Sequence, residues 1–145
     1  MPAMQVPQQP LVSALIALQF VAFGWRINRE ITVGDQNRKT WLPLPDYLNL
    51  ISLLAVSGLC VAAPLGWGFI RFSGPALSAG YMLIAFHPVS EAAHYRLLFS
   101  GRGRSVYLSG PTPRDYPWIT GQELLSVAVS VVLAGTVCWY TALSS

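Results

Sequence analysis

Residues 76–99 read ALSAGYMLIAFHPVSEAAHYRLLF, an apolar segment whose second half contains the ionisable stretch FHPVSEAAHYR. A helix of about 20 apolar residues crosses the ~30 Å hydrocarbon core of a bilayer. The stretch holds both histidines of the protein and the carboxylate of Glu91. Ionisable groups inside a membrane span are costly and usually face a partner or a cavity. This stretch is therefore the first candidate for a functional site.

Three more segments have the same apolar character, and the composition agrees with them. Of the 145 residues, 53% are hydrophobic and 10% are charged, whereas about 25% of residues are charged in soluble domains. We therefore predict an all-α, polytopic membrane protein. It forms one domain over residues 1–145, a left-handed, up-down bundle of four transmembrane helices. The predicted spans are residues 11–27, 47–67, 76–99 and 121–143.

Local signals predict where two of these helices begin. Asp46 follows a proline and is expected to be the N-cap of the second span. Thr120 and Glu123 have the spacing of a capping box and lie just before an apolar run, which predicts the start of the fourth span. Short β-prone runs around residues 31–33 and 40–42 suggest a small β-hairpin in the first loop.

Basic residues are concentrated on one side of the predicted bundle. Only Arg71 lies on the opposite side. Since basic loops stay in the cytoplasm, loops 28–45 and 100–117 are predicted to be cytoplasmic and both termini to lie outside. Tryptophans near both ends of the spans agree with an interfacial aromatic belt. The other eight basic residues are Arg26, Arg29, Arg38, Lys39, Arg96, Arg102, Arg104 and Arg114.

The net charge of +3 indicates contact with lipid headgroups, because no solvated basic face is available for nucleic acid. Arg102 and Arg104 are the expected headgroup contacts. The expected partners are membrane lipids together with copies of this chain or other membrane subunits.

His87, Glu91 and His94 share one stripe of the third span, with Gly80 further along the same face, at about 100° per residue. They form the candidate functional polar stripe. Pro88 predicts a kink beside His87.

Three functions remain open for this stripe. The first is a structural role in a scaffold or a subunit of a homo- or hetero-oligomer, with Arg96 as the charge partner of Glu91; this is the preferred interpretation. The second is an ion or proton path in an oligomeric channel or transporter. The third is a membrane enzyme or a metal or haem protein using the same three residues, in which Glu91 and His94 have the i, i+3 spacing of metal sites in helical bundles. No cofactor and no catalytic residue is predicted.

Other polar or small residues are interpreted as helix contacts. Gln19 and Asn49 are expected to join the first two spans. Cys60 and Cys138 are expected to behave as small apolar residues, and a bond between them stays open. The size and four-span layout resemble those of membrane-associated glutathione and eicosanoid enzymes, but their arginine–asparagine signature is missing from the second span, so no family is assigned. The close-packing faces are predicted at Ser57, Gly58 and Ala62 and at Ser126 and Ser130.

Overall fold

The described part of the protein is almost entirely helical, as predicted. The computed structural model describes residues 8–35, 42–67, 72–94, 105–107 and 119–144. Its helices are α1 (Gln8–Asp35), α2 (Leu44–Val56), the π-helical η1 (Ser57–Ala62), α3 (Ala63–Trp67), α4 (Ser73–His94) and α5 (Gly121–Ser144). Since α2, η1 and α3 follow one another without a break, they form one long helical segment.

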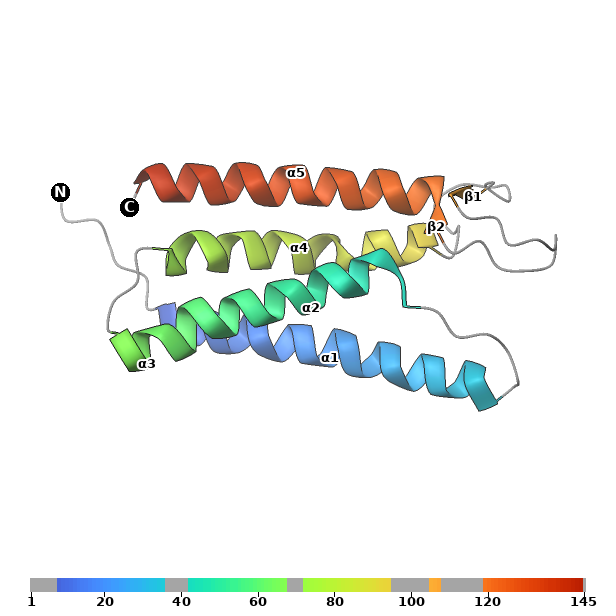
Figure 1. Cartoon of the computed structure of the whole chain (residues 1–145), viewed down its shortest axis with the longest axis horizontal. Helices are drawn as coiled ribbons and strands as arrows, with labels where there is room; N and C mark the ends of the chain where they lie inside the picture. Colours follow the sequence, from blue (N-terminus) through green and yellow to red (C-terminus); the bar gives the residue numbers. More distant parts are fainter. Residues whose placement is uncertain (1–7, 36–41, 68–71, 95–104, 108–118, 145) are drawn as a thin grey trace.

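The four long helical segments alternate in direction and pack side by side (Figure 1). Helix α1 begins and α5 ends at the same end of the molecule. Helix α4 lies between α5 on one side and the pair formed by α1 and α2 on the other, and it contacts all three. The third predicted span is therefore the central helix of the described structure.

Apolar and polar side chains are distributed inside out relative to a soluble protein. Large apolar residues are exposed along the helices, as at Val21 in α1, Leu65 in α3 and Val132 in α5. One charged residue from each of α1, α2, α4 and α5 is instead buried, namely Arg26, Asp46, Glu91 and Glu123. Because lipid solvates apolar side chains and does not solvate charges, this distribution is the one expected inside a bilayer.

Three segments are long and apolar enough to cross a membrane, namely Gln9–Thr32, Leu44–Gly66 and Gly121–Ser144. Helix α4 has 22 residues, which corresponds to a length of about 33 Å, but it is not among these three. It carries His87, Glu91 and His94 and is the helix most enclosed by neighbours.

The capping box at the start of α5 is confirmed. The Thr120 hydroxyl accepts a hydrogen bond from the Glu123 backbone N–H at 3.0 Å, and the Thr120 N–H donates to Glu123 Oε2 at 3.3 Å. The prediction that Asp46 is the N-cap of the second helix is wrong. Pro43 occupies that position without a side-chain cap, and Asp46 lies in the first turn with its side chain turned inward.

The predicted hairpin in the first loop is also wrong for the strand at residues 31–33. Helix α1 continues through them to Asp35, so a helix already established over several turns overrides their β propensity. Residues 36–41 lie outside the described part. An antiparallel pair that was not predicted, β1 (Ser105–Tyr107) with β2 (Ile119–Thr120), lies in the connection before α5.

The apolar core is small and lies away from the charged groups. It consists of Val12 and Leu15 from α1, Val56 from α2 and Leu77 from α4. Gly80 of α4 allows the close approach there, because a Cβ at this position would lie 2.7 Å from Leu15 Cδ2 and 3.0 Å from Val56 Cγ2.

The predicted close-packing face of the second segment is not used within the described chain. Gly58 and Ala62 are exposed and Ser57 is half-buried. Cys60 and Cys138 are both free thiols.

We expect Gly80→Ala to be less stable than Gly135→Ala by about 1–3 kcal/mol, since only the first overpacks the core. Nothing lies within 4 Å of a Cβ placed at Gly135. Both substitutions gain the same helix propensity, so their difference isolates the packing cost. Unfolding in mixed detergent micelles, followed by circular dichroism, measures it. Equal unfolding free energies for the two variants would show that α4 can move away from Leu15.

Candidate functional site

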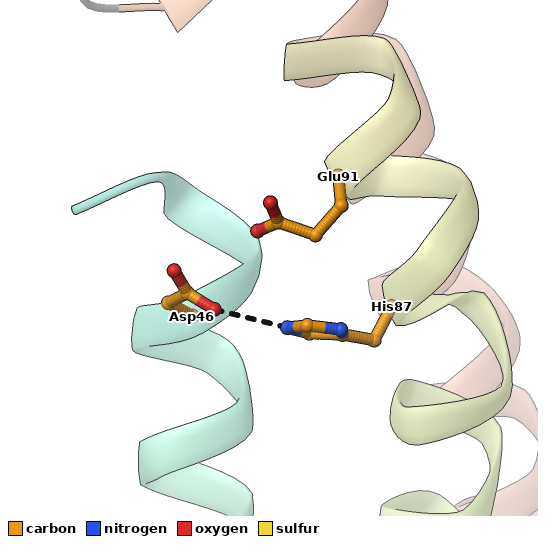
Figure 2. A group of neighbouring side chains, drawn as sticks. All are labelled: Asp46, His87 and Glu91. Atoms are coloured by element: carbon orange, nitrogen blue, oxygen red, sulfur yellow. Dashed lines mark hydrogen bonds and ion pairs between the residues drawn. The ribbon is translucent and has the colours of Figure 1, made fainter. Parts of the chain in front are cut away.

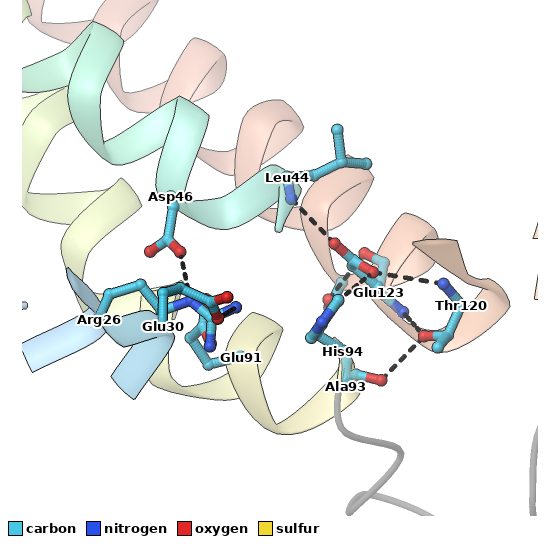
Figure 3. Close-up of polar contacts among 10 residues, drawn as sticks. Arg26, Glu30, Leu44, Asp46, Glu91, Ala93, His94, Thr120 and Glu123 are labelled. Atoms are coloured by element: carbon cyan, nitrogen blue, oxygen red, sulfur yellow. Dashed lines mark hydrogen bonds and ion pairs between the residues drawn. The ribbon is translucent and has the colours of Figure 1, made fainter. Parts of the chain in front are cut away.

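A buried arginine is the centre of the charged region. Arg26 of α1 is only 1% exposed. Its guanidinium lies 2.7 Å from Glu30 Oε1, 2.9 Å from Asp46 Oδ2 and 3.9 Å from Glu91 Oε2 (Figure 3). These contacts bring one residue of α2 and one of α4 to the same side chain of α1. We call Arg26, Glu30, Asp46, His87 and Glu91 the ionic cluster.

His87 completes the link between α2 and α4. Its Nε2 lies 3.0 Å from Asp46 Oδ1, and Asp46 is fully buried (Figure 2). The other carboxylate oxygen of Asp46 faces Arg26. A carboxylate oxygen accepts hydrogen bonds, so we assign the donated proton to His87 Nε2. The orientation of the imidazole is thereby fixed by a residue on another helix.

Glu91 differs from the other members of the ionic cluster. It is 6% exposed, and neither of its carboxylate oxygens has a hydrogen-bond partner among the described residues. Among the described residues, the cation that contacts it is Arg26, at 3.9 Å. A buried carboxylate without hydrogen bonds is costly. The Glu91 oxygens are therefore available to accept a hydrogen bond or to bind a cation.

A second group of polar contacts surrounds Glu123 at the start of α5. The fully buried Glu123 carboxylate lies 2.8 Å from His94 Nδ1 and accepts a hydrogen bond from the Leu44 backbone N–H at 2.9 Å (Figure 3). The Thr120 hydroxyl donates to the Ala93 carbonyl at 2.8 Å. Glu123 thus supplies the acceptor that α2 lacks at its own N-terminus and joins α2, α4 and α5.

An amide layer lies deeper along the helices than the ionic cluster. Gln19 Nε2 donates to Ser52 Oγ at 2.8 Å, and Asn49 Nδ2 donates to the Gln19 carbonyl at 3.2 Å. The prediction that Gln19 and Asn49 join the first two helices is therefore confirmed. Together with the ionic cluster, this layer adds buried polar contacts between α1 and α2 to the apolar ones of the core.

The predicted stripe is brought together only in part. His87 and Glu91 are buried with Gly80 on the inner side of α4. His94 is half-buried and pairs with Glu123 instead of joining them. Helix α4 remains α-helical through Pro88, so His87 keeps its register with Glu91. The predicted charge partner Arg96 and the predicted headgroup contacts Arg102 and Arg104 lie outside the described residues.

Asp46 takes the place that the sequence interpretation gave to His94. Oxygen or nitrogen atoms of Asp46, His87 and Glu91 all lie within 4.8 Å of one another. From the sequence, Asp46 was interpreted as a helix cap and Arg26 as a topology signal. Asp46 follows a proline, and Arg26 lies near the predicted membrane interface. Neither feature predicts that the two residues pair, because the pairing joins separate helices.

No protein-family model, curated protein or solved structure matches this chain. The class is therefore defined by the structure itself: a helical protein with three membrane-length apolar helices and buried charges contributed by four helices.

Proposed function

We propose that the protein is an integral membrane protein in which α4 is a fourth span, enclosed by the three apolar ones in an up-down bundle. The apolar exterior of α1, α3 and α5 and the burial of the ionic cluster support this proposal. The length of α4, about 33 Å, suffices to cross the hydrocarbon core. Buried partners on three neighbouring helices lower the cost of its ionisable residues.

The orientation we propose places both termini outside and loops 28–45 and 100–117 in the cytoplasm. Arg26 is buried in the ionic cluster and no longer counts as a loop charge. Seven of the nine basic residues still fall in the sequence within or next to these two loops; they are the eight counted on this side less Arg26. A bias of this size favours the same orientation.

Within the membrane, we propose a non-enzymatic role as a scaffold or subunit that works by helix association. The observation that carries this proposal is that the buried charges contact residues of other helices. Arg26 joins α1 to Asp46 of α2, and Glu123 of α5 contacts His94 of α4. Charge pairs between helices specify which helices associate and in which register.

The outer face of α5 is our candidate for the contact with a second copy of the chain. Only Glu123, Ser130 and Ala134 of α5 are buried, so the predicted face containing Ser130 is turned into the molecule. On the opposite side Gly135 is exposed and has open space where a Cβ would lie. A small residue on an exposed membrane helix lets another helix approach closely.

We expect Gly135→Leu to convert an oligomer into a monomer without unfolding the chain. Gly24→Leu is the matched control, because Gly24 is also exposed and has nothing within 4 Å of its Cβ position, but lies on α1. Mass measurement by light scattering in mild detergent reads out both variants. A monomeric wild type, or the same oligomer in Gly135→Leu, would contradict association through this face.

The alternative is an ion or proton path along His87, Glu91 and His94. Its support is the ionisable, buried lining of α4. Against it, the apolar cluster around Leu15, Val56 and Leu77 lies about 15 Å further along the helices and interrupts the polar residues. A continuous path would therefore need contributions from another chain. Conductance of reconstituted protein that is lost in Glu91→Gln would favour this alternative over the scaffold.

A further inference from the structure

Two carboxylates and one imidazole converge inside the molecule from two helices. Asp46 of α2 and His87 and Glu91 of α4 are all buried. Figure 2 shows the Glu91 carboxylate extending from α4 toward α2, beside the hydrogen bond between Asp46 and His87. We propose that these three side chains bind a divalent transition-metal ion, a property beyond the scaffold role.

The first support is the unused carboxylate. Both Glu91 oxygens are buried and lack a hydrogen-bond partner among the described residues, while all three side chains already lie within 4.8 Å of one another. A ligand that binds here would satisfy Glu91 without breaking a hydrogen bond that Glu91 makes. Because the three ligand atoms are already close together and buried, the site needs little rearrangement to bind an ion.

The second support is the charge balance. The buried charged residues of the ionic cluster are one arginine, Arg26, and two carboxylates, Asp46 and Glu91, so with His87 counted as neutral their sum is 1 − 2 = −1. Excess charge in a buried site is costly unless a counterion neutralises it. A cation bound beside Glu91 offsets this negative charge.

The third support is the donor chemistry and the spacing. An imidazole with two carboxylates suits Zn²⁺, Mn²⁺ or Fe²⁺, whereas Ca²⁺ and Mg²⁺ prefer oxygen ligands alone. Adjacent ligand atoms at about 2.1 Å from such an ion are about 3.0–3.4 Å apart. His87 Nε2 and Asp46 Oδ1 are 3.0 Å apart. The metal would take the place of the proton between these two atoms, and the imidazole proton would then reside on Nδ1.

The test is a CoCl₂ titration of full-length protein that has been purified in detergent and stripped with EDTA. Co²⁺ gives d–d absorption bands that report coordination, and competition with ZnCl₂ and metal analysis after desalting give the stoichiometry. We expect one Co²⁺ per chain and displacement by Zn²⁺. Glu91→Gln keeps the side-chain shape and is expected to fold, yet to weaken Co²⁺ binding at least about 100-fold, since it removes a charged ligand.

His94→Gln is the matched control. It changes the other histidine of α4, which pairs with Glu123 outside the proposed site, and glutamine can still donate to that carboxylate. We expect its Co²⁺ affinity to equal that of the wild type. Absence of Co²⁺ uptake by folded wild type at about 1 mM, or equal uptake by Glu91→Gln, would overturn the proposal. An infrared band of a protonated carboxyl, missing in Glu91→Gln, would then assign the charge balance to a bound proton.

Discussion

Arg26→Met is expected to destabilise the folded protein by about 3–5 kcal/mol, because it removes the cation from a buried group of carboxylates. Asp46 and Glu91 would remain buried, and of the described basic side chains His87 would still contact Asp46. Methionine fills a comparable volume, so the loss reports the charge more than a cavity. The measurement is the unfolding free energy in mixed micelles, followed by circular dichroism.

Arg29→Met provides the control for Arg26→Met. Arg29 lies on the same helix less than one turn away and is exposed. Charge pairs of exposed residues contribute about 0–1 kcal/mol, so this variant should be nearly as stable as the wild type. Equal stability of Arg26→Met and Arg29→Met would mean that Arg26 reaches the lipid headgroups or water in the folded protein, contrary to its burial.

Glu123→Leu is expected to destabilise the folded protein by a similar amount, about 3–5 kcal/mol. The Glu123 carboxylate contacts His94 and accepts hydrogen bonds from the backbone N–H groups of Leu44 and Thr120. Without it, the first turn of α2 loses its acceptor, and the half-buried imidazole of His94 loses its contact with α5. Thermal unfolding with tryptophan fluorescence as the signal measures the loss.

Glu123→Gln separates shape from charge. Its amide oxygen can still accept from Leu44 and its amide nitrogen can donate to His94, so we expect a loss of only about 1–2 kcal/mol. Gln122→Leu is the neighbouring control, since Gln122 Oε1 is buried without a partner among the described residues. This variant should be no less stable than the wild type. A Glu123→Gln loss as large as that of Glu123→Leu would assign the effect to the ion pair alone.

The helical architecture was predictable because it is encoded locally. Runs of about 20 apolar residues leave few alternatives to a membrane helix, and the capping box from Thr120 to Glu123 marks its helix start through contacts within four residues. The inner side of α4 was predictable for the same reason, since the spacing of Gly80, His87 and Glu91 alone places them on one face.

The composition of the site could not be predicted in the same way. Arg26 is followed by further polar residues, which is also the pattern of an interfacial arginine, and Asp46 follows a proline, which is the pattern of a helix cap. Their burial depends on which helices become neighbours and at what depth. The pairing of His94 with Glu123 likewise requires that the C-terminal end of α4 lies beside the N-terminal end of α5. No local sequence pattern encodes that contact.

If buried charges hold the helices together, Arg26 and Asp46 are energetically coupled, and a double-mutant cycle measures this coupling. Arg26→Met, Asp46→Leu and the double variant are compared with the wild type by their unfolding free energies. Arg26 and Asp46 are in contact at 2.9 Å, so we predict a coupling of about 1–3 kcal/mol, with the double variant more stable than the sum of the single losses implies. Additivity within about 0.5 kcal/mol would contradict the account, because residues that do not interact behave in that way.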